Sequence, residues 1–270
     1  RAQPFDQQHN PCIPRCTNPK LQPMTSSISV VVGGNGALGS AICDQLHAEG
    51  HNLVIASRNS AADAPGNAKF HQLDVTDQES VDTFALWLQS LNAPLRLLVF
   101  LPAAPTDGGI SDASVDAIMT AVDVKVGGLL RLTRALTSTF NRETAILVIG
   151  GNLAFDPIPF AATSGIANAA LANTVRQLQF PLGKLGVRIH LIAPGPVDTE
   201  RWWTLAQAEA KKRGVDSSVI LSEATAASSS GKLTTTAEVA WAVSMLANPM
   251  AAALTGSTLL LDGGRRTASP

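Results

Sequence analysis

From residue 28 onward, short apolar runs alternate with longer stretches in which apolar residues recur every three or four positions. The short runs predict buried strands, and the longer stretches predict amphipathic helices. The predicted strands are residues 28–32, 53–56, 70–74, 95–101, 145–149, 187–193 and 258–261. The predicted helices are about 37–49, 77–91, 114–139, 161–180 and 236–247. This alternation is typical of an α/β domain, with a doubly wound parallel sheet of about seven strands between two helical layers (αβα).

Two segments lack this periodicity. Residues 1–27 are polar and contain five prolines, which predicts a flexible N-terminal extension ahead of one domain at 28–270. Residues 196–235 form a long polar insertion before the last predicted helix and strand. The insertion therefore lies near the end where parallel strands place their ligands.

Composition excludes several classes of partner. The formal net charge is −1, which gives no basis for binding nucleic acid or an acidic membrane surface. No apolar run approaches the roughly 20 residues of a membrane span. Three cysteines without metal-ligand spacing predict reduced thiols, no metal site and a cytoplasmic protein.

A glycine-rich loop joins the first predicted strand to the first predicted helix. Gly33, Gly36 and Gly39 follow the spacing that lets a pyrophosphate approach the backbone. The helix behind them offers free N–H groups and the positive end of its dipole. We therefore predict a Rossmann-type dinucleotide site that includes Asn35 and Leu38 as well.

The end of the second predicted strand bears on which dinucleotide binds. A site for NADH carries an acidic residue there, about 20 residues beyond the glycines, to bind the ribose hydroxyl. This chain has Ser57 and Arg58 instead. Because a guanidinium suits a 2′-phosphate, NADPH or NADP⁺ is expected and NADH is disfavoured.

Several motifs in one order resemble the short-chain dehydrogenase/reductase family over residues 28–264. The motifs are Gly33-x-x-Gly36-x-x-Gly39, Asp74-Val75, Pro194-Gly195-x-Val197-x-Thr199, Thr255-Gly256 and Asp262-Gly263-Gly264. The resemblance implies that Asp74-Val75 contacts the adenine ring and that Thr199 meets the nicotinamide carboxamide or a phosphate. It also implies that the insertion at 196–235 is a substrate lid.

The catalytic residues of that family are Asn, Ser, Tyr and Lys, and none of the four is present. Lys125 stands at the position of the asparagine, Gly151 at the serine, Ser164 at the tyrosine and Asn168 at the lysine. The chain contains no tyrosine, so no other register restores the set. Serine is a far weaker acid than tyrosine, and asparagine has no charge to activate it. The usual alcohol–ketone proton relay is therefore not expected.

Other groups near the expected nicotinamide position are candidates for the missing chemistry. Asp156 is either a carboxylate that stabilises a substrate cation or donates a proton, or a turn residue before Pro157. Lys125 either binds a substrate oxygen or Ser164, or braces its helix. Ser164 either contacts substrate or only packs, and Asn168 is a candidate for binding the nicotinamide ribose.

Trp202 and Trp203 open the insertion. They suit an aromatic or cationic substrate through stacking and cation–π contacts, or else they anchor the lid or form a subunit contact. The two long helices at about 114–139 and 161–180 are where members of the family usually associate. The resemblance therefore implies a homodimer or homotetramer.

Three hypotheses for function remain open. The first is an NADPH-dependent reductase with a non-standard acid, acting on a C=N, a C=C or an activated carbonyl of a small molecule. The second is a redox-neutral cyclase or isomerase, which has precedent among fungal alkaloid enzymes related to the family. The third is a catalytically silent binder that reports the state of the cofactor to a partner protein.

Overall fold

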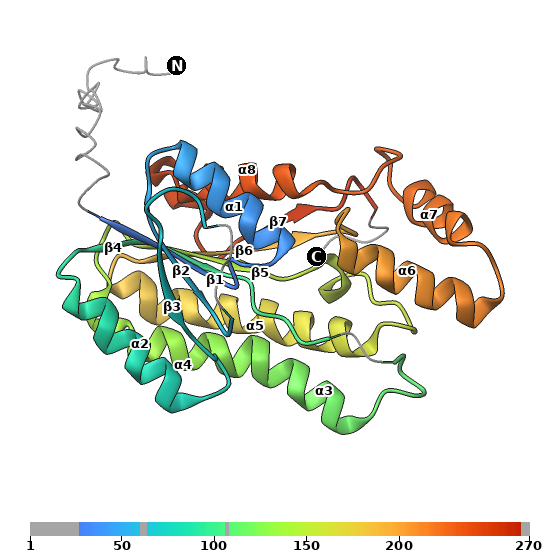
Figure 1. Cartoon of the computed structure of the whole chain (residues 1–270), viewed down its shortest axis with the longest axis horizontal. Helices are drawn as coiled ribbons and strands as arrows, with labels where there is room; N and C mark the ends of the chain where they lie inside the picture. The colour runs from blue at the N-terminus through green and yellow to red at the C-terminus, as the bar shows by residue number, and fades with distance from the viewer. Residues whose placement is uncertain (1–26, 60–63, 106–107, 266–270) are drawn as a thin grey trace, which may run out of the picture.

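The computed structural model describes residues 27–59, 64–105 and 108–265. The expected extension therefore lies outside the described residues, except for Ser27. The seven strands form one parallel sheet in the order β3-β2-β1-β4-β5-β6-β7 (Figure 1). The strand order reverses between β1 and β4, which is the point at which such sheets bind ligands. The predicted fold class and strand number are confirmed.

The strands agree with the predicted runs to within two residues. They are β1 (Ile28–Val32), β2 (Asn52–Ser57), β3 (Lys69–Gln72), β4 (Leu95–Phe100), β5 (Ala145–Ile149), β6 (Arg188–Pro194) and β7 (Thr258–Leu261). Every residue of β1 and β5 is buried, because helices cover both faces of the sheet. By contrast, the edge strand β3 is largely exposed, and Asp74 lies beyond its end.

Helices and helical turns alternate with the strands. They are α1 (Ala37–Ala48), α2 (Gln78–Ser90), α3 (Val115–Val122), the π-turn η2 (Asp123–Gly127), α4 (Gly128–Ala135), η3 (Thr137–Thr139), η4 (Asn152–Ala154), α5 (Ala162–Lys184), α6 (Glu200–Arg213), α7 (Ser217–Ala226), α8 (Thr236–Ala247) and η5 (Pro249–Leu254). The long helix predicted at 114–139 is thus a rod of four pieces with a π-turn in its middle. A π-turn adds one residue to a helical turn, and apolar spacing does not reveal it.

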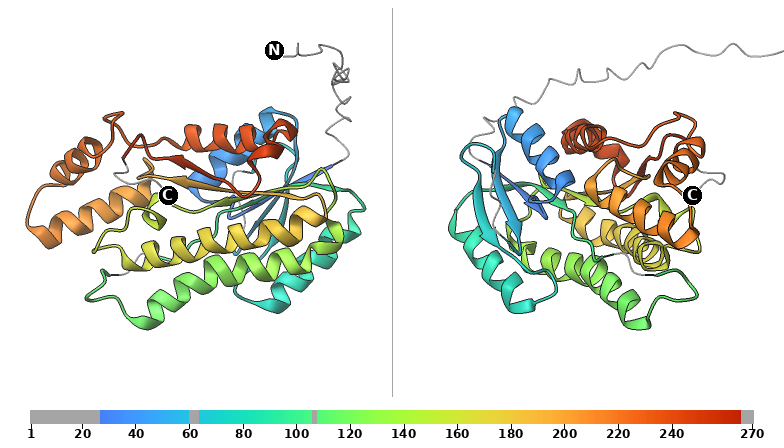
Figure 2. Two further views of the ribbon diagram at one scale, coloured as in Figure 1. Left: turned by 180° about the vertical axis from the view of Figure 1, so that it is seen from behind. Right: turned by 45° about the vertical axis from the view of Figure 1, so that its right-hand side comes forward.

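Two apolar cores fill the space on the two faces of the sheet. Helices α1 and α8 pack on one face, and α2, α4 and α5 pack on the other (Figures 1 and 2). Helices α6 and α7, which lie in the segment expected to form a lid, extend beyond the carboxyl ends of the strands (Figure 1). The packed sheet and its helices hold the loops at the carboxyl ends of the strands in place.

The predicted end of the helix at about 161–180 is wrong by four residues. Helix α5 continues through Pro181 to Lys184, whereas the prediction stopped it at Phe180. Proline removes one backbone hydrogen bond, but here it lies in the last turn, is exposed and leaves the helix intact. Burial of Leu182 against the core continues the apolar stripe beyond the proline and stabilises this turn.

Candidate functional site

The glycine loop lies between the carboxyl end of β1 and the first turn of α1. A Cβ on Gly39 would overlap the carbonyl oxygen of Gly33 and lie 2.6 Å from the Cα of Gly34, so this position requires glycine for the fold. A Cβ on Gly36 would meet only the Gly33 oxygen, at 3.8 Å, and would otherwise point into open space. The loop therefore keeps an open cradle in front of the helix N-terminus, which suits a pyrophosphate.

The end of β2 is tied to this loop. Ser57 is buried, and its hydroxyl donates to the carbonyl of Asn59 at 2.6 Å. The side-chain amide of Asn35 donates to the same carbonyl at 3.3 Å. The side chain of Leu38 packs against the core beneath the loop. Arg58 is exposed beside these residues, where its guanidinium is accessible to a phosphate group.

Asp74 and Val75 lie in the loop after β3. The backbone N–H and the hydroxyl of Thr76 both donate to one carboxylate oxygen of Asp74, at 2.9 and 2.7 Å. These two bonds, together with the charges of Arg58 and Arg131, hold the pKa of Asp74 below its usual value. The carboxylate is thus held in place by Thr76, and its contact with an adenine ring stays a prediction.

Gly151 and Asn168, the residues predicted to stand at the family's serine and lysine, lie against each other. Asn168 is buried on α5, and its amide nitrogen lies 2.7 Å from where a Cβ on Gly151 would be. The amide therefore occupies the space of a serine side chain. The Asn168 side-chain oxygen is buried and has no hydrogen-bond partner within the described residues. An unsatisfied acceptor in this position suits a hydroxyl donor such as a ribose.

Lys125 lies at the centre of the π-turn η2, which packs against α5. Its side chain is buried, with 8% of the residue exposed. Among the described residues it takes part in no recorded hydrogen bond or ion pair. Burial, and secondly the charge of Arg201, lower the pKa of Lys125 to about 8. A lysine with this pKa can hold or release a proton near neutral pH.

Ser164 and Asp156 are the remaining candidates for the missing chemistry. Ser164 is partly buried in the first turn of α5, one helical turn before Asn168. Asp156 is partly exposed in the turn after η4, and its backbone N–H donates to the Asn152 carbonyl at 3.0 Å. That turn bond agrees with the structural interpretation of Asp156. No described ion pair joins its carboxylate to Lys125.

The Pro-Gly motif leads from β6 into the lid. Pro194 ends the buried strand, and Gly195 donates its N–H to the Leu261 carbonyl at 2.8 Å. Val197 forms a parallel bridge with Thr234. Thr199 is the N-cap of α6, and its hydroxyl accepts from the Trp202 N–H at 3.4 Å. The predicted contact of Thr199 with the cofactor thus competes with its role as a helix cap.

Trp202 and Trp203 meet edge to face, with ring centroids 4.9 Å apart. The Trp203 indole N–H donates to the Asp198 carboxylate at 2.9 Å, which fixes that ring to the start of the lid. This geometry agrees with the anchoring interpretation for Trp203. Trp202 is partly exposed, so part of its ring remains accessible.

Two polar residues, Asn152 and Arg201, were not predicted as site residues. Asn152 is buried after β5, and its amide nitrogen has no partner within the described chain. Arg201 lies in the first turn of α6, and its guanidinium donates to the Ala104 carbonyl at 2.8 Å. The sequence signals were faint: Asn152 follows two glycines at a strand end, and Arg201 immediately precedes the tryptophan pair.

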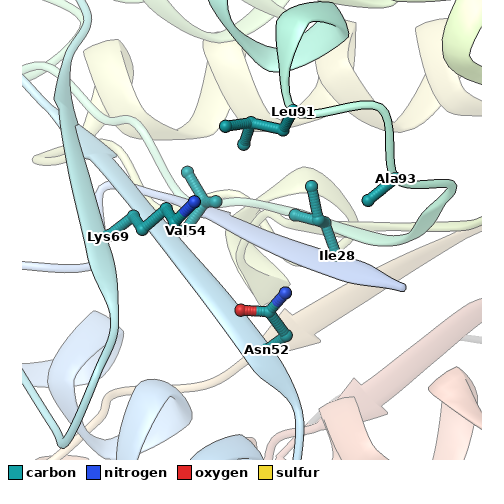
Figure 3. Close-up of a pocket in the computed structure, with 6 residues that line it drawn as sticks. All are labelled: Ile28, Asn52, Val54, Lys69, Leu91 and Ala93. Atoms are coloured by element: carbon teal, nitrogen blue, oxygen red, sulfur yellow. The ribbon is translucent and has the colours of Figure 1, made fainter. Parts of the chain in front are cut away.

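A small cavity lies at the opposite edge of the sheet. It measures about 50 Å³ and is lined by residues at the amino ends of β1, β2 and β3 and by Leu91 and Ala93 (Figure 3). It holds none of the candidate residues.

Comparison with known proteins agrees with this architecture. Residues 33–266 match a family model described as Enoyl-(Acyl carrier protein) reductase. The 3-oxoacyl-[acyl-carrier-protein] reductase MabA of Mycobacterium avium is 28% identical over 87% of this chain and 88% of its own. The short-chain reductase NovJ of Streptomyces niveus is 26% identical over 88% and 94%.

Solved structures show the same fold. An NADPH-bound short-chain oxidoreductase of Pseudomonas aeruginosa, described as having an atypical catalytic centre, superimposes with a TM-score of 0.80 at 22% identity, over 91% of this chain and 99% of its own. A short-chain dehydrogenase family protein of Francisella tularensis gives a TM-score of 0.81 at 21% identity, over 88% and 98%. No helix in the described part of the chain is long and apolar enough to span a membrane. The chain belongs to the short-chain dehydrogenase/reductase family of oxidoreductases.

Proposed function

We propose that this protein is an NADPH-dependent reductase that acts on a C=N, a C=C or an activated carbonyl of a small molecule. The observation that carries the proposal is the buried Lys125, which forms no ion pair with a carboxylate of the described residues and lies on a π-turn that packs against α5, the helix that carries Asn168. The cradle supplies a place for a nicotinamide cofactor. Lys125 supplies the acid that the missing tyrosine would have provided.

The cofactor would be held by groups spread along the carboxyl edge of the sheet. The backbone of Gly33, Asn35, Gly36 and Leu38 would bind the pyrophosphate, and Ser57 and Arg58 the 2′-phosphate. Asp74 and Val75 would bind the adenine, and Asn168 a hydroxyl of the nicotinamide ribose. Pro194, Gly195, Val197 and Thr199 would line the nicotinamide. The NADPH of the Pseudomonas aeruginosa relative supports this choice.

NADPH, when bound, would supply the hydride. The chain would supply the proton: the Lys125 ammonium would donate it to the atom of the double bond that does not receive the hydride, and a proton from solvent would restore the ammonium. With a pKa of about 8, the ammonium is a stronger acid than an ordinary lysine and a better match to neutral pH. Ser164 and the Asn152 amide are further donors beside the same centre.

The test is transfer of deuterium from NADPH labelled at either face of C4. The acceptors are pyrroline, cyclohexenone and ethyl trifluoroacetoacetate, and the products are read by mass spectrometry. We expect transfer from one face only. We expect kcat/KM to fall about tenfold per pH unit above pH 8, as Lys125 loses its proton.

Variants at Lys125 distinguish a loss of proton donation from a loss of cofactor binding. Lys125→Met should reduce the rate by about 10²–10⁴-fold while leaving NADPH affinity within threefold of wild type, roughly as for loss of a general acid. Lys125→Arg should retain part of the rate and lose the fall near pH 8. Tight NADPH binding without transfer to any acceptor would favour the silent binder, and turnover with unchanged cofactor would favour the cyclase or isomerase.

We also propose that the protein forms a homodimer or homotetramer through α3 and α5. These helices pack against each other on one side of the molecule (Figures 1 and 2). Their outer faces expose large apolar side chains: Val115, Met119, Ile166 and Phe180. Exposed large apolar side chains on packed helices support a subunit contact there.

A further inference from the structure

Helices α6 and α7 form a hairpin that lies outside both apolar cores. No residue of α6 or α7 belongs to the two apolar clusters that the described residues form on the faces of the sheet. The two helices pack on each other and extend away from the sheet (Figures 1 and 2). Arg213 and Glu223 join them through two hydrogen bonds of 2.6 Å each. The hairpin is therefore one unit that lacks the buried apolar contacts by which the other helices are held.

Both ends of the hairpin are tied to the rest of the domain. Val197 and Thr234 form a parallel bridge, so the chain segments that enter and leave the hairpin run side by side. After α7, the hydroxyl of Ser228 donates to the Gly263 carbonyl at 3.1 Å, and the N–H of Ser230 donates to the same carbonyl at 3.2 Å. These contacts fix the ends of the hairpin and do not involve the body of either helix.

One ion pair joins the body of the hairpin to the rest of the described chain. The ammonium of Lys212, in the last turn of α6, lies 3.3 Å from a carboxylate oxygen of Asp112, in the turn before α3. Within the part of the chain that the structure describes, no other hydrogen bond or ion pair links residues 204–222 to anything outside the hairpin. Both side chains are more than half exposed, so water and salt reach this contact.

The turn that carries Asp112 has a fixed shape. The Gly109 N–H donates to the other carboxylate oxygen of Asp112 at 2.5 Å, and the Ile110 N–H donates to the Pro159 carbonyl at 2.7 Å. A Cβ on Gly109 would lie 2.6 Å from that same carbonyl oxygen, and Gly108 has a φ of +65°, so both positions favour glycine. The turn therefore presents the carboxylate to α6 from a rigid support.

We propose that the α6–α7 hairpin is a hinged lid, and that the ion pair between Lys212 and Asp112 is the latch that holds it closed. The hairpin turns about its tied ends, and release of the latch opens the carboxyl edge of the sheet to a small molecule. The inference goes beyond the proposed function, because the motion belongs to the chain itself and requires no reaction. An exposed ion pair is weak and is screened by salt, which suits a latch that must open repeatedly.

The test is a distance measurement by pulsed electron paramagnetic resonance. Spin labels are attached to Gln207→Cys on α6 and to Leu86→Cys on α2, because both residues are exposed. Cys12 and Cys16 are replaced by serine, and the buried Cys43 is left in place. Labelled protein is mixed with an excess of unlabelled protein, so that each measured distance lies within one chain. We expect two distances, one for the closed and one for the open hairpin.

Charge variants assign the closed state to the latch. Lys212→Glu should raise the ratio of open to closed molecules about two- to fivefold, roughly the effect of losing an exposed ion pair. Asp112→Asn should raise it similarly, because the asparagine keeps an acceptor for the Gly109 N–H and removes only the charge. Lys211→Glu is the matched control: it makes the same charge change at a neighbouring exposed residue that forms no ion pair with the described residues, and it should leave the ratio unchanged.

Salt gives a second prediction, whose sign depends on the latch. Raising the salt concentration from about 0.1 M to about 1 M shortens the screening length from about 10 Å to about 3 Å. The open share should rise in the wild type, where salt weakens an attraction, and fall in Lys212→Glu, where salt weakens a repulsion from Asp112. One unchanged distance in the wild type, Lys212→Glu and Asp112→Asn overturns the inference, and so does an equal response of Lys211→Glu. None of these results depends on NADPH or on turnover, so a failure of deuterium transfer is a separate outcome.

Discussion

At the scale of single residues, the residues at positions 151 and 168 depend on each other. The amide of Asn168 fills the volume that a side chain at position 151 would need. The sequence predicts that Lys125, on the π-turn, stands at the family's asparagine and that Asn168, on α5, stands at the family's lysine. The contact between Asn168 and position 151 depends on side-chain placement and could not be predicted from the sequence.

Restoring the serine alone should therefore harm the protein. We expect Gly151→Ser to lower the free energy of unfolding by about 1–3 kcal/mol, because the Asn168 amide must leave its place. The same change in an Asn168→Ala background should be close to neutral relative to that background. Urea unfolding monitored by circular dichroism measures both. Equal costs in the two backgrounds would show that the two residues are independent.

At the scale of elements, most of the fold could be predicted from the sequence. Apolar runs define strands because both faces of this sheet are covered, and apolar spacing defines the helices that cover it. The π-turn could not be predicted, because Lys125 and its neighbours keep helical spacing. Helices α6 and α7 could not be predicted either, because they lie on an exposed lid, where weak amphipathic patterns are sufficient.

Gly39→Ala and Gly36→Ala, both in the glycine loop, form a matched pair of substitutions. Gly39→Ala places a methyl group against backbone atoms and should destabilise the fold by about 1–3 kcal/mol. Gly36→Ala points its methyl into the open cradle, so stability should change by less than about 1 kcal/mol. Its NADPH affinity should nevertheless fall at least about tenfold. Thermal unfolding and fluorescence titration distinguish the two effects. Unchanged NADPH affinity in Gly36→Ala would show that the pyrophosphate binds elsewhere.

At the scale of the whole molecule, segments that are remote in sequence meet near the candidate residues. Arg201, in the first turn of α6, donates to the Ala104 carbonyl in the loop after β4 at 2.8 Å. Sequence motifs led to predictions for the cofactor groups, which follow strands in a fixed order. They did not predict this contact, because the meeting of α6 with the loop after β4 is a tertiary contact.

The apolar faces of α3 and α5 give a prediction for assembly. Light scattering at micromolar concentration should give at least the mass of a dimer. The double variant Met119→Glu/Ile166→Glu should shift it to a monomer, because it places charges on both exposed faces. Leu86→Glu, on the exposed side of α2, should leave the mass unchanged. A monomeric wild type would contradict the proposed assembly.

The contact between Gly151 and Asn168 has a consequence for any attempt to install the family's catalytic residues in this chain. A serine at position 151 meets the Asn168 amide, and a lysine at position 168 would bury an ammonium in place of a neutral amide. The two positions would therefore have to be changed together.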